Sequence, residues 1–312
     1  MYYVKKLLSL CATVILVTIL AFLAFSVIPG DAALLKLGTD ATPEQVEALR
    51  EEMGLDRNVV VRYFDWIGGV VKGDFGESSY YNMPVADILG ERIAVTLLLA
   101  LIAIIMIVVV SFPVAVLASR KEYGITDRAV VIGSEIFISM PAFFLGMLII
   151  LIFGLTLKVF TVGGYVSYKE DFAGFMYYMI FPALAIAIPK TATVVKFLRS
   201  NIIKEKNKDY VRTLRAMGTS ERTILWRHVL KNAMIPTITF IGLVIVEVVA
   251  GSVIVEQVFS VPGLGRQLCV SIGHRDYNLV QAIVLFLGVS VVVINFVVDM
   301  LYHVGRRDSE TV

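Results

Sequence analysis

Six long apolar segments constrain the fold of this chain more than any other feature of its sequence. A helix needs roughly 20 residues to cross about 30 Å of hydrocarbon, and a helix satisfies its own backbone polar groups there. Charged residues make up only 17% of the chain, and its mean hydropathy is +0.81. We therefore predict an all-α integral membrane protein with six transmembrane helices. The segments are residues 7–28, 93–118, 129–157, 174–195, 233–255 and 280–302.

Three prolines fall in the two middle segments. Pro141 lies in the third segment, and Pro182 and Pro189 lie in the fourth. A proline inside a helix removes one backbone hydrogen bond and clashes with the preceding turn. We therefore expect kinks in both segments.

The distribution of Lys and Arg predicts the orientation in the membrane. With the N-terminus inside, 17 of the 28 Lys and Arg residues fall on the inner connections and 10 fall on the longer outer connections. Positive charge concentrates in cytoplasmic loops. We therefore predict that both termini are cytoplasmic and that the chain lies in the inner (cytoplasmic) membrane as a multi-pass protein.

The predicted domain organisation follows from these segments. Residues 1–28 form the first transmembrane helix, and residues 29–92 form an extracytoplasmic helical cap loop. Residues 93–304 form a five-helix core that includes the cytoplasmic loop 196–231. Residues 305–312 form a cytoplasmic tail.

The predicted cap loop carries the signals of two helices. Thr42 to Gln45 match a capping box with proline at the first helical position, and Gly54 is the expected end of that helix. A second, amphipathic helix is expected over residues 56–72. It places four apolar side chains on one face: Val60, Phe64, Ile67 and Val71. The alternative is a solvated connection without a fold of its own.

The loop 196–231 is basic and carries clear signals for where helices begin and end. It has ten Lys or Arg and three acidic residues. A helix is expected over 209–217, followed by a stop at Gly218 with a positive φ and a new start at Thr219 or Ser220, with Glu221 in the first turn. The expected apolar anchors are Leu214, Met217, Ile224 and Leu225.

Three interpretations of this loop are open from the residues alone. Helices with positive charge are compatible with nucleic-acid binding, with the positive-inside rule alone, or with docking of a soluble partner. The charge favours the second interpretation. The glycine stop, the immediate restart and the apolar anchors favour the third.

Several motifs of enzymes are absent from the sequence. There is no G-x-x-x-x-G-K-[ST] motif and no Gly-Lys dipeptide, so the chain has no P-loop of its own for ATP. H-E-x-x-H, C-x-x-C and G-x-S-x-G are also absent, and Cys11 and Cys269 lack metal-ligand spacing. We therefore expect a protein that is not an enzyme, with no catalytic residues, no metal site and no cofactor of its own.

Five ionisable residues lie within or near the apolar segments. An ionised side chain at the bilayer centre costs about 2.5–3.5 kcal/mol on insertion scales, so each should face protein or water. Glu247 and Glu135 are candidates for a translocation pathway, with a hydrogen bond between helices as the alternative for Glu247. Lys190 and Asp299 are expected to reach the membrane interface. Glu256 is expected either to bond to loop backbone or to serve the pathway.

The basic loop resembles a known pattern. Residues 209–218 (DYVRTLRAMG) and 227–236 (RHVLKNAMIP) are similar to the cytoplasmic EAA loop of binding-protein-dependent ABC importer permeases, in the dipeptide/oligopeptide/nickel branch and its B-type subunit. The Glu-Ala-Ala that names the loop is replaced by Arg212, Thr213 and Leu214, whereas Gly218 matches. Further similar motifs are PGD at 29–31, MGLD at 53–56, GDFG at 73–76, SMP at 139–141, VFSVPGLG at 258–265 and RDY at 275–277.

The resemblance implies a type I ABC importer permease fold and a set of partners. These would be a second, C-type permease in a heterodimer, two cytoplasmic ATPases that bind ATP and Mg²⁺, and an extracytoplasmic substrate-binding protein, with no role for nucleic acid. The loop would be the coupling helix through which the ATPases act. The implied coupling residues are Arg212, Arg215, Ala216, Gly218, Thr219 and Ser220.

The resemblance leaves the cargo open. Di- and oligopeptides are the first hypothesis, and nickel or a metal chelate is the alternative within the same machine. Glu247 favours a cationic cargo, whereas the scarcity of histidine argues against soft-metal ligation. A stand-alone secondary transporter would show inverted repeats, and a membrane sensor would need a signalling domain; the sequence shows neither.

Overall fold

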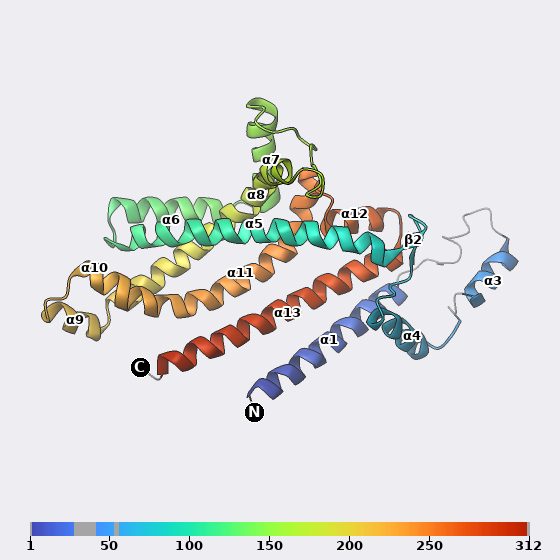
Figure 1. The fold of residues 1–312 in the computed structure, drawn as a ribbon, viewed down its shortest axis with the longest axis horizontal. Helices are drawn as coiled ribbons and strands as arrows, with labels where there is room; N and C mark the ends of the chain where they lie inside the picture. The colour runs from blue at the N-terminus through green and yellow to red at the C-terminus, as the bar shows by residue number, and fades with distance from the viewer. Residues whose placement is uncertain (1, 28–41, 53–55, 311–312) are drawn as a thin grey trace. The chain divides into compact units, whose positions relative to one another are not determined.

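The computed structural model describes residues 2–27, 42–52 and 56–310, and it is mostly helical (Figure 1). Its contacts define two compact units. The first comprises Met1–Val95 and Pro262–Val293, and the second comprises Thr96–Val261 and Ile294–Val312. Two long helices, α5 (Val85–Ser119) and α13 (Tyr277–Glu310), contribute residues to both units.

The first unit contains the two helices expected in the segment after the first apolar run. The capping box is confirmed, because the Thr42 N–H donates to Gln45 Oε1 at 3.0 Å and the Gln45 N–H donates to Thr42 Oγ1 at 3.4 Å. The second helix begins at Val59 rather than at Asp56, and Asn58 caps it by accepting from the Val60 N–H at 2.9 Å. Besides parts of α5 and α13, the unit contains α1 (Tyr2–Val27), α3 (Pro43–Glu52), α4 (Val59–Val71), β1 (Glu77–Ser78), β2 (Met83–Pro84) and α12 (Leu264–Gly273).

Some sequence motifs lie outside the described residues. These are the motif at 29–31, the predicted helix end at Gly54 and most of the motif at 53–56, and the last two residues of the predicted tail. The predicted domain boundaries remain a prediction.

A short hairpin departs from the all-α prediction. Strands β1 and β2 pair antiparallel, with Glu77 opposite Pro84 and Ser78 opposite Met83. Gly76 precedes the hairpin with a φ of +81°, which only glycine adopts without strain. The sequence carries no signal of this hairpin, because two-residue strands have no alternating apolar pattern to detect.

Contacts between distant segments hold the hairpin in the first unit. The Ser78 hydroxyl donates to the buried Asp276 carboxylate, whose Oδ1 also accepts from the Ser79 N–H at 3.3 Å. Asn278 donates to the Glu77 carbonyl oxygen at 2.8 Å. An apolar core lies beside these bonds and is formed by Val85, Ile88, Leu89, Leu264, Leu279, Ala282 and Ile283. The GDFG and RDY motifs, about 200 residues apart in the chain, therefore belong to one packed structure.

The second unit is a helical assembly around α8 (Phe172–Lys206), which packs against α6, α7 and α11. Helix α8 continues through Pro182 and Pro189 without a break in its 35 residues. Besides parts of α5 and α13, the unit contains α6 (Ile125–Ile138), α7 (Ala142–Ile149), the π-helix η1 (Ile150–Thr156), α9 (Asp209–Ala216), α10 (Glu221–Thr223), the π-helix η2 (Ile224–Val229) and α11 (Leu230–Phe259).

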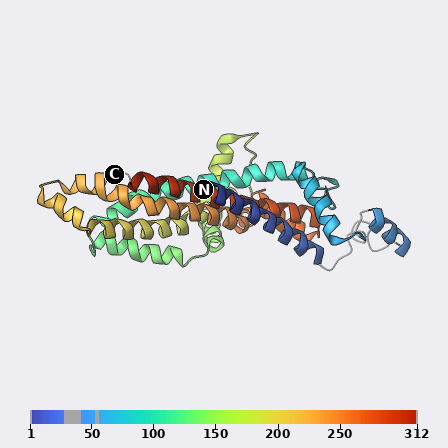
Figure 2. The ribbon, with the colours of Figure 1, turned by 90° about the horizontal axis from the view of Figure 1, so that it is seen from below.

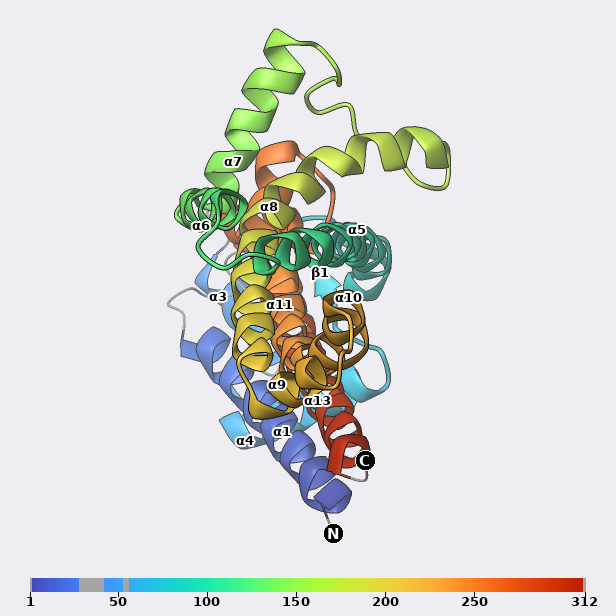
Figure 3. The same ribbon diagram turned by 90° about the vertical axis from the view of Figure 1, so that its left-hand side faces the viewer.

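Five helices in the described part of the chain are long and apolar enough to cross a membrane. They are Val4–Phe25, Val85–Ser119, Phe172–Lys206, Glu221–Phe259 and Tyr277–Met300. The third predicted segment is instead a pair of helices, Ile125–Ile138 and Ala142–Thr156, which meet at 97° (Figure 3). Pro141 lies at this break with an extended ψ of 143°, as expected for a residue that starts a new helix without continuing the old one. The count reaches six when the bent pair is taken as one span.

Candidate functional site

The α9–α10 knob is the best-defined feature of the basic loop, and it lies at the end of α8 and α11 (Figures 1 and 2). We use this name for residues 207–229. Helix α9 ends at Ala216, and Gly218 follows with a φ of +82°, as predicted. The Thr219 N–H donates to the Leu214 carbonyl at 3.1 Å, and the Gly218 N–H donates to the Arg215 carbonyl at 3.0 Å. These two bonds form a Schellman motif, in which the residue with positive φ closes the helix end.

The restart of the helix is capped as the sequence predicts. The Ser220 Oγ accepts from the Thr223 N–H at 3.3 Å. Glu221 stands in the first turn of α10 and pairs with Arg215 of α9 at 2.5 Å. The hydrogen bond with the Glu221 carboxylate raises the pKa of the Arg215 guanidinium above its usual value. The ion pair crosses the glycine stop, so the two helices are linked by side chains as well as by backbone.

The tip of the knob exposes side chains to its surroundings. Arg212, Ala216, Met217 and Gly218 are exposed, and a Cβ added at Gly218 would meet nothing within 4 Å. Met217, one of the four predicted apolar anchors, is 75% exposed, so it presents its side chain to the surroundings. Met217 follows the last helical residue, where the helical period no longer determines which way a side chain points.

The other three predicted anchors attach the knob to the chain. Ile224 is 1% exposed, and Leu214 and Leu225 are partly buried against the same core. This core also includes Val211 and Val229 of the knob and residues of α5, α8 and α11: Ala115, Val116, Val195, Leu198, Ile202, Leu230 and Ala233. The knob is therefore packed directly against three long helices.

A polar network that the sequence analysis did not find reinforces this attachment. The buried carboxylate of Glu205, at the end of α8, accepts from the Tyr210 hydroxyl at 3.0 Å and from Asn232 Nδ2 at 3.1 Å. Lys208 pairs with the same carboxylate at 2.7 Å. Burial raises the pKa of the Tyr210 phenol. An acidic residue among many basic ones was the only sequence signal, and its partners 5 and 27 residues away could not be inferred from it.

A second charged cluster lies where α6 begins. Asp127 is 2% exposed, and its carboxylate accepts hydrogen bonds from Nε and Nη2 of Arg199, the latter at 2.6 Å. It also accepts from the Tyr123 N–H at 2.8 Å. Lys206 donates to the Ser119 carbonyl at 2.9 Å, at the end of α5. These bonds hold the short connection between α5 and α6 onto α8.

Three of the five ionisable residues, Glu247, Glu135 and Lys190, form ion pairs between helices. Glu247 of α11 pairs with Lys190 of α8 at 2.5 Å, and their side chains are 58% and 31% exposed. Glu135 of α6 pairs with Lys196 of α8 at 2.5 Å. Lys190 therefore has a carboxylate partner on α11. The sequence predicted that Lys190 reaches toward the membrane interface. The negative charge of Glu247 thus has a positive partner within the chain.

Glu256 is the most buried of these groups. Its side chain is fully buried and accepts from the Thr96 hydroxyl at 2.7 Å. The sequence predicts either a bond to loop backbone or a role in the pathway for Glu256. The structure shows a bond from a hydroxyl on another helix, which ties α11 to α5.

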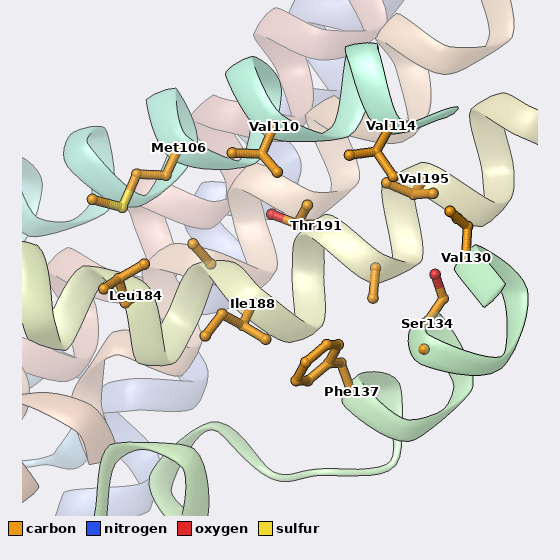
Figure 4. Close-up of a pocket in the computed structure, with 13 residues that line it drawn as sticks. Met106, Val110, Val114, Val130, Ser134, Phe137, Leu184, Ile188, Thr191 and Val195 are labelled. Carbon is orange, nitrogen blue, oxygen red and sulfur yellow. The ribbon is translucent and has the colours of Figure 1, made fainter. Parts of the chain in front are cut away.

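An apolar cavity of about 350 Å³ lies between α5, α6 and α8 (Figure 4). Met106, Val110 and Val114 of α5 face Leu184 and Ile188 of α8 across it. The polar groups that its lining side chains offer are the hydroxyls of Ser134 and Thr191. This lining has no charged group with which to recognise a charged solute.

Within the described residues, no three His, Cys, Asp or Glu side chains gather closely enough to hold a metal ion. Three of the charged groups of α8 pair with carboxylates of other helices: Lys190 with Glu247, Lys196 with Glu135 and Arg199 with Asp127.

Comparisons with known proteins agree with this architecture. Residues 111–307 match the family described as binding-protein-dependent transport system inner membrane component, and residues 1–100 match the N-terminal model of the same systems. The chain belongs to this family. The transport component is thus a multi-pass protein of the inner membrane, and the α9–α10 knob falls within the matched region.

Curated relatives of this transport component match it over nearly its whole length. The probable peptide ABC transporter permease protein y4tP of Sinorhizobium fredii is 33% identical over 96% of each chain. The oligopeptide transport system permease protein AppB of Bacillus subtilis is 34% identical over 97% of each chain. The glutathione transport system permease protein GsiC of Escherichia coli K12 is 35% identical over 96% of each chain.

Proposed function

We propose that this chain is the permease subunit of an ABC importer that moves di- and oligopeptides inward. Its relatives in three bacteria are named as permeases for peptides, oligopeptides and glutathione, and glutathione is itself a small peptide. The proposed mechanism depends on the α9–α10 knob. The knob is a rigid and exposed element that is anchored to three long helices. The chain contains no P-loop, so the energy for transport has to come from separate ATPases.

The proposed partners follow from the family. Two cytoplasmic ATPases bind ATP and Mg²⁺, an extracytoplasmic protein delivers the solute, and a C-type permease completes the pathway as a heterodimer. Both termini are cytoplasmic in this proposal, with the bent pair α6–α7 counted as one of six spans. This orientation puts the knob on the same side as the ATPases.

The knob transmits force in the proposed mechanism. Ala216, Met217 and Gly218 at the tip offer small and apolar surface for close contact with an ATPase. Arg212, Thr219 and Ser220 flank the tip, and the Arg215–Glu221 pair keeps α9 and α10 from separating under load. Movement of the tip then passes through Val211 and Ile224 to the core shared with α8 and α11.

The ion pair between Lys190 and Glu247 is our candidate for the solute pathway. A peptide carries a positive and a negative terminus, and each can compete for one member of a half-exposed pair. Glu135, paired with Lys196 on the same helix α8, is the second candidate. The apolar cavity in Figure 4 has no such groups.

The cargo is tested with the external protein that delivers it. Isothermal calorimetry of that protein, with di- and oligopeptides and separately with Ni²⁺, should show tight peptide binding and weak nickel binding. Tight binding of nickel or a nickel chelate without peptide binding would show that the nickel alternative is correct.

The dependence on ATPases is tested separately. Proteoliposomes with both permeases, the ATPases and the binding protein should take up labelled peptide when ATP is enclosed with the ATPases. The same vesicles without ATPases should take up almost none. Equal uptake in both would show that this chain works as a secondary transporter.

A further inference from the structure

Helix α4 exposes an apolar stripe. Val60, Phe64 and Val71 are 60%, 65% and 81% exposed, and Ile67 is half-buried beside them. At about 100° per residue, these four side chains fall within roughly 60° of one another around the helix axis. The sequence predicted the stripe as an amphipathic face, and the structure leaves most of it without a cover in the described chain.

The polar side chains of α4 lie on the opposite side of the helix. Asp65 falls away from the stripe by the same helical geometry, and it pairs with Arg57 at 3.5 Å with both side chains exposed. Lys72 follows the last residue of the helix. The helix thus has a polar face that prefers water and an apolar stripe that does not.

Helix α4 is attached to a membrane span. The hydroxyls of Tyr63 and Thr18 are 2.8 Å apart and hydrogen-bonded, and Phe22 of α1 contacts the rings of Tyr63 and Trp66 with centroids 5.5 and 5.6 Å apart. Thr18 and Phe22 lie inside the apolar span Val4–Phe25, about 10 and 5 Å from its end at 1.5 Å per residue. The contacts therefore hold α4 at the depth where this span leaves the hydrocarbon.

The exposed stripe is continuous with this contact. Tyr63 borders the stripe on the helix surface, and α1 itself exposes Leu16, Leu20 and Leu23 over the same turns. Trp and Tyr side chains are enriched at membrane–water interfaces, because their rings are apolar and their polar tips reach water. An apolar surface that continues from a span to an attached helix fits a lipid surface.

We propose that α4 is an interfacial helix that lies in the headgroup region of the membrane, with Val60, Phe64, Ile67 and Val71 in the lipid and Asp65 in water. Such helices bury their apolar face about 5–10 Å into the boundary. The lipid then fixes the height and tilt of α4. This proposal depends on α1 crossing the membrane and is independent of the solute carried.

The test measures where spin labels on α4 lie. Cys11 and Cys269 are free and exposed, so both are first replaced by serine. Nitroxides are then attached to Phe64→Cys and Val60→Cys on the stripe, and to Asp65→Cys as the matched control on the same helix. The variants are reconstituted with the partner permease in vesicles of phosphatidylethanolamine and phosphatidylglycerol. Power saturation compares accessibility to oxygen, which concentrates in lipid, with accessibility to a water-soluble nickel chelate.

The expected oxygen-to-chelate ratio is several-fold higher at positions 60 and 64 than at position 65. Equal accessibility to the chelate at all three positions would mean that the stripe is solvated, and the proposal would be wrong. Protection of positions 60 and 64 from both reagents would mean that a protein covers the stripe, which also contradicts the proposal.

A second measurement leaves α4 unchanged. The chain has two tryptophans, so Trp226→Phe makes Trp66 the only one. Brominated phosphatidylcholine with bromine near the headgroup should quench Trp66 fluorescence several-fold more than bromine near the bilayer centre. Quenching by aqueous iodide alone would contradict the proposal.

Discussion

The α9–α10 knob and helix α4 are both short helical segments at the ends of long apolar helices, but they place their apolar side chains differently. The knob buries Val211 and Ile224 in the chain's own core and exposes two large apolar residues, Met217 at its tip and Trp226. Helix α4 buries none of its residues completely and exposes a whole stripe. The knob is therefore fixed by protein, as an element that transmits force must be. By our proposal, a lipid surface covers the exposed stripe of α4.

The buried ion pair beside the knob should give the largest effect on stability. Asp127→Ala leaves the Arg199 guanidinium without its carboxylate partner and should destabilise the second unit by about 3 kcal/mol. Thermal unfolding of the purified permease in mild detergent measures this loss. Arg212→Ala is the control, because its pair with Asp209 is exposed and should contribute less than about 1 kcal/mol. Equal effects of the two substitutions would refute the anchoring role of Asp127.

The contrast between the two segments predicts a second difference. Val211→Ala removes buried methyl groups and leaves a cavity, so it should cost about 2 kcal/mol in the same unfolding measurement. Phe64→Ala removes a larger side chain from α4 but should change stability in detergent by less than about 0.5 kcal/mol, because Phe64 is exposed. A larger loss for Phe64→Ala would show that α4 is covered by protein.

The ion pair inside the spans should give a smaller change in stability than Asp127→Ala or Val211→Ala. Glu247→Gln weakens its pairing with Lys190 and should cost about 1 kcal/mol, since polar contacts between membrane helices average near this value. The double exchange Lys190→Glu with Glu247→Lys should restore stability. If the pair lines the pathway, peptide uptake stays reduced in the exchanged protein. Full recovery of uptake would assign the pair a structural role only.

Local signals in the sequence predicted local structure well. The capping box at Thr42, the positive φ of Gly218 and the cap at Ser220 each depend on residues within a few positions, and all three are present. Pro141 marked a kink, but its size of 97° depends on how α7 packs against α8 and α11.

Long-range contacts were not accessible from the sequence. Glu205 meets Asn232 across 27 residues, Asp127 meets Arg199 across 72, and Ser78 meets Asp276 across 198. Composition showed that charges in the apolar helices need partners, because a lone charge in the membrane is costly. It did not show which helix supplies each partner, because this depends on how the helices pack.

Substitution at Gly218 tests most directly whether the knob couples ATP hydrolysis to transport. Gly218→Val forces a β-branched residue to a φ of +82° and should abolish the peptide-stimulated part of ATP hydrolysis in proteoliposomes of the complete importer. Asparagine tolerates this φ, so Gly218→Asn should keep most of the peptide-stimulated hydrolysis. The account predicts this difference with both variants folded and assembled to the same extent. Normal peptide-stimulated hydrolysis and uptake by Gly218→Val would contradict it.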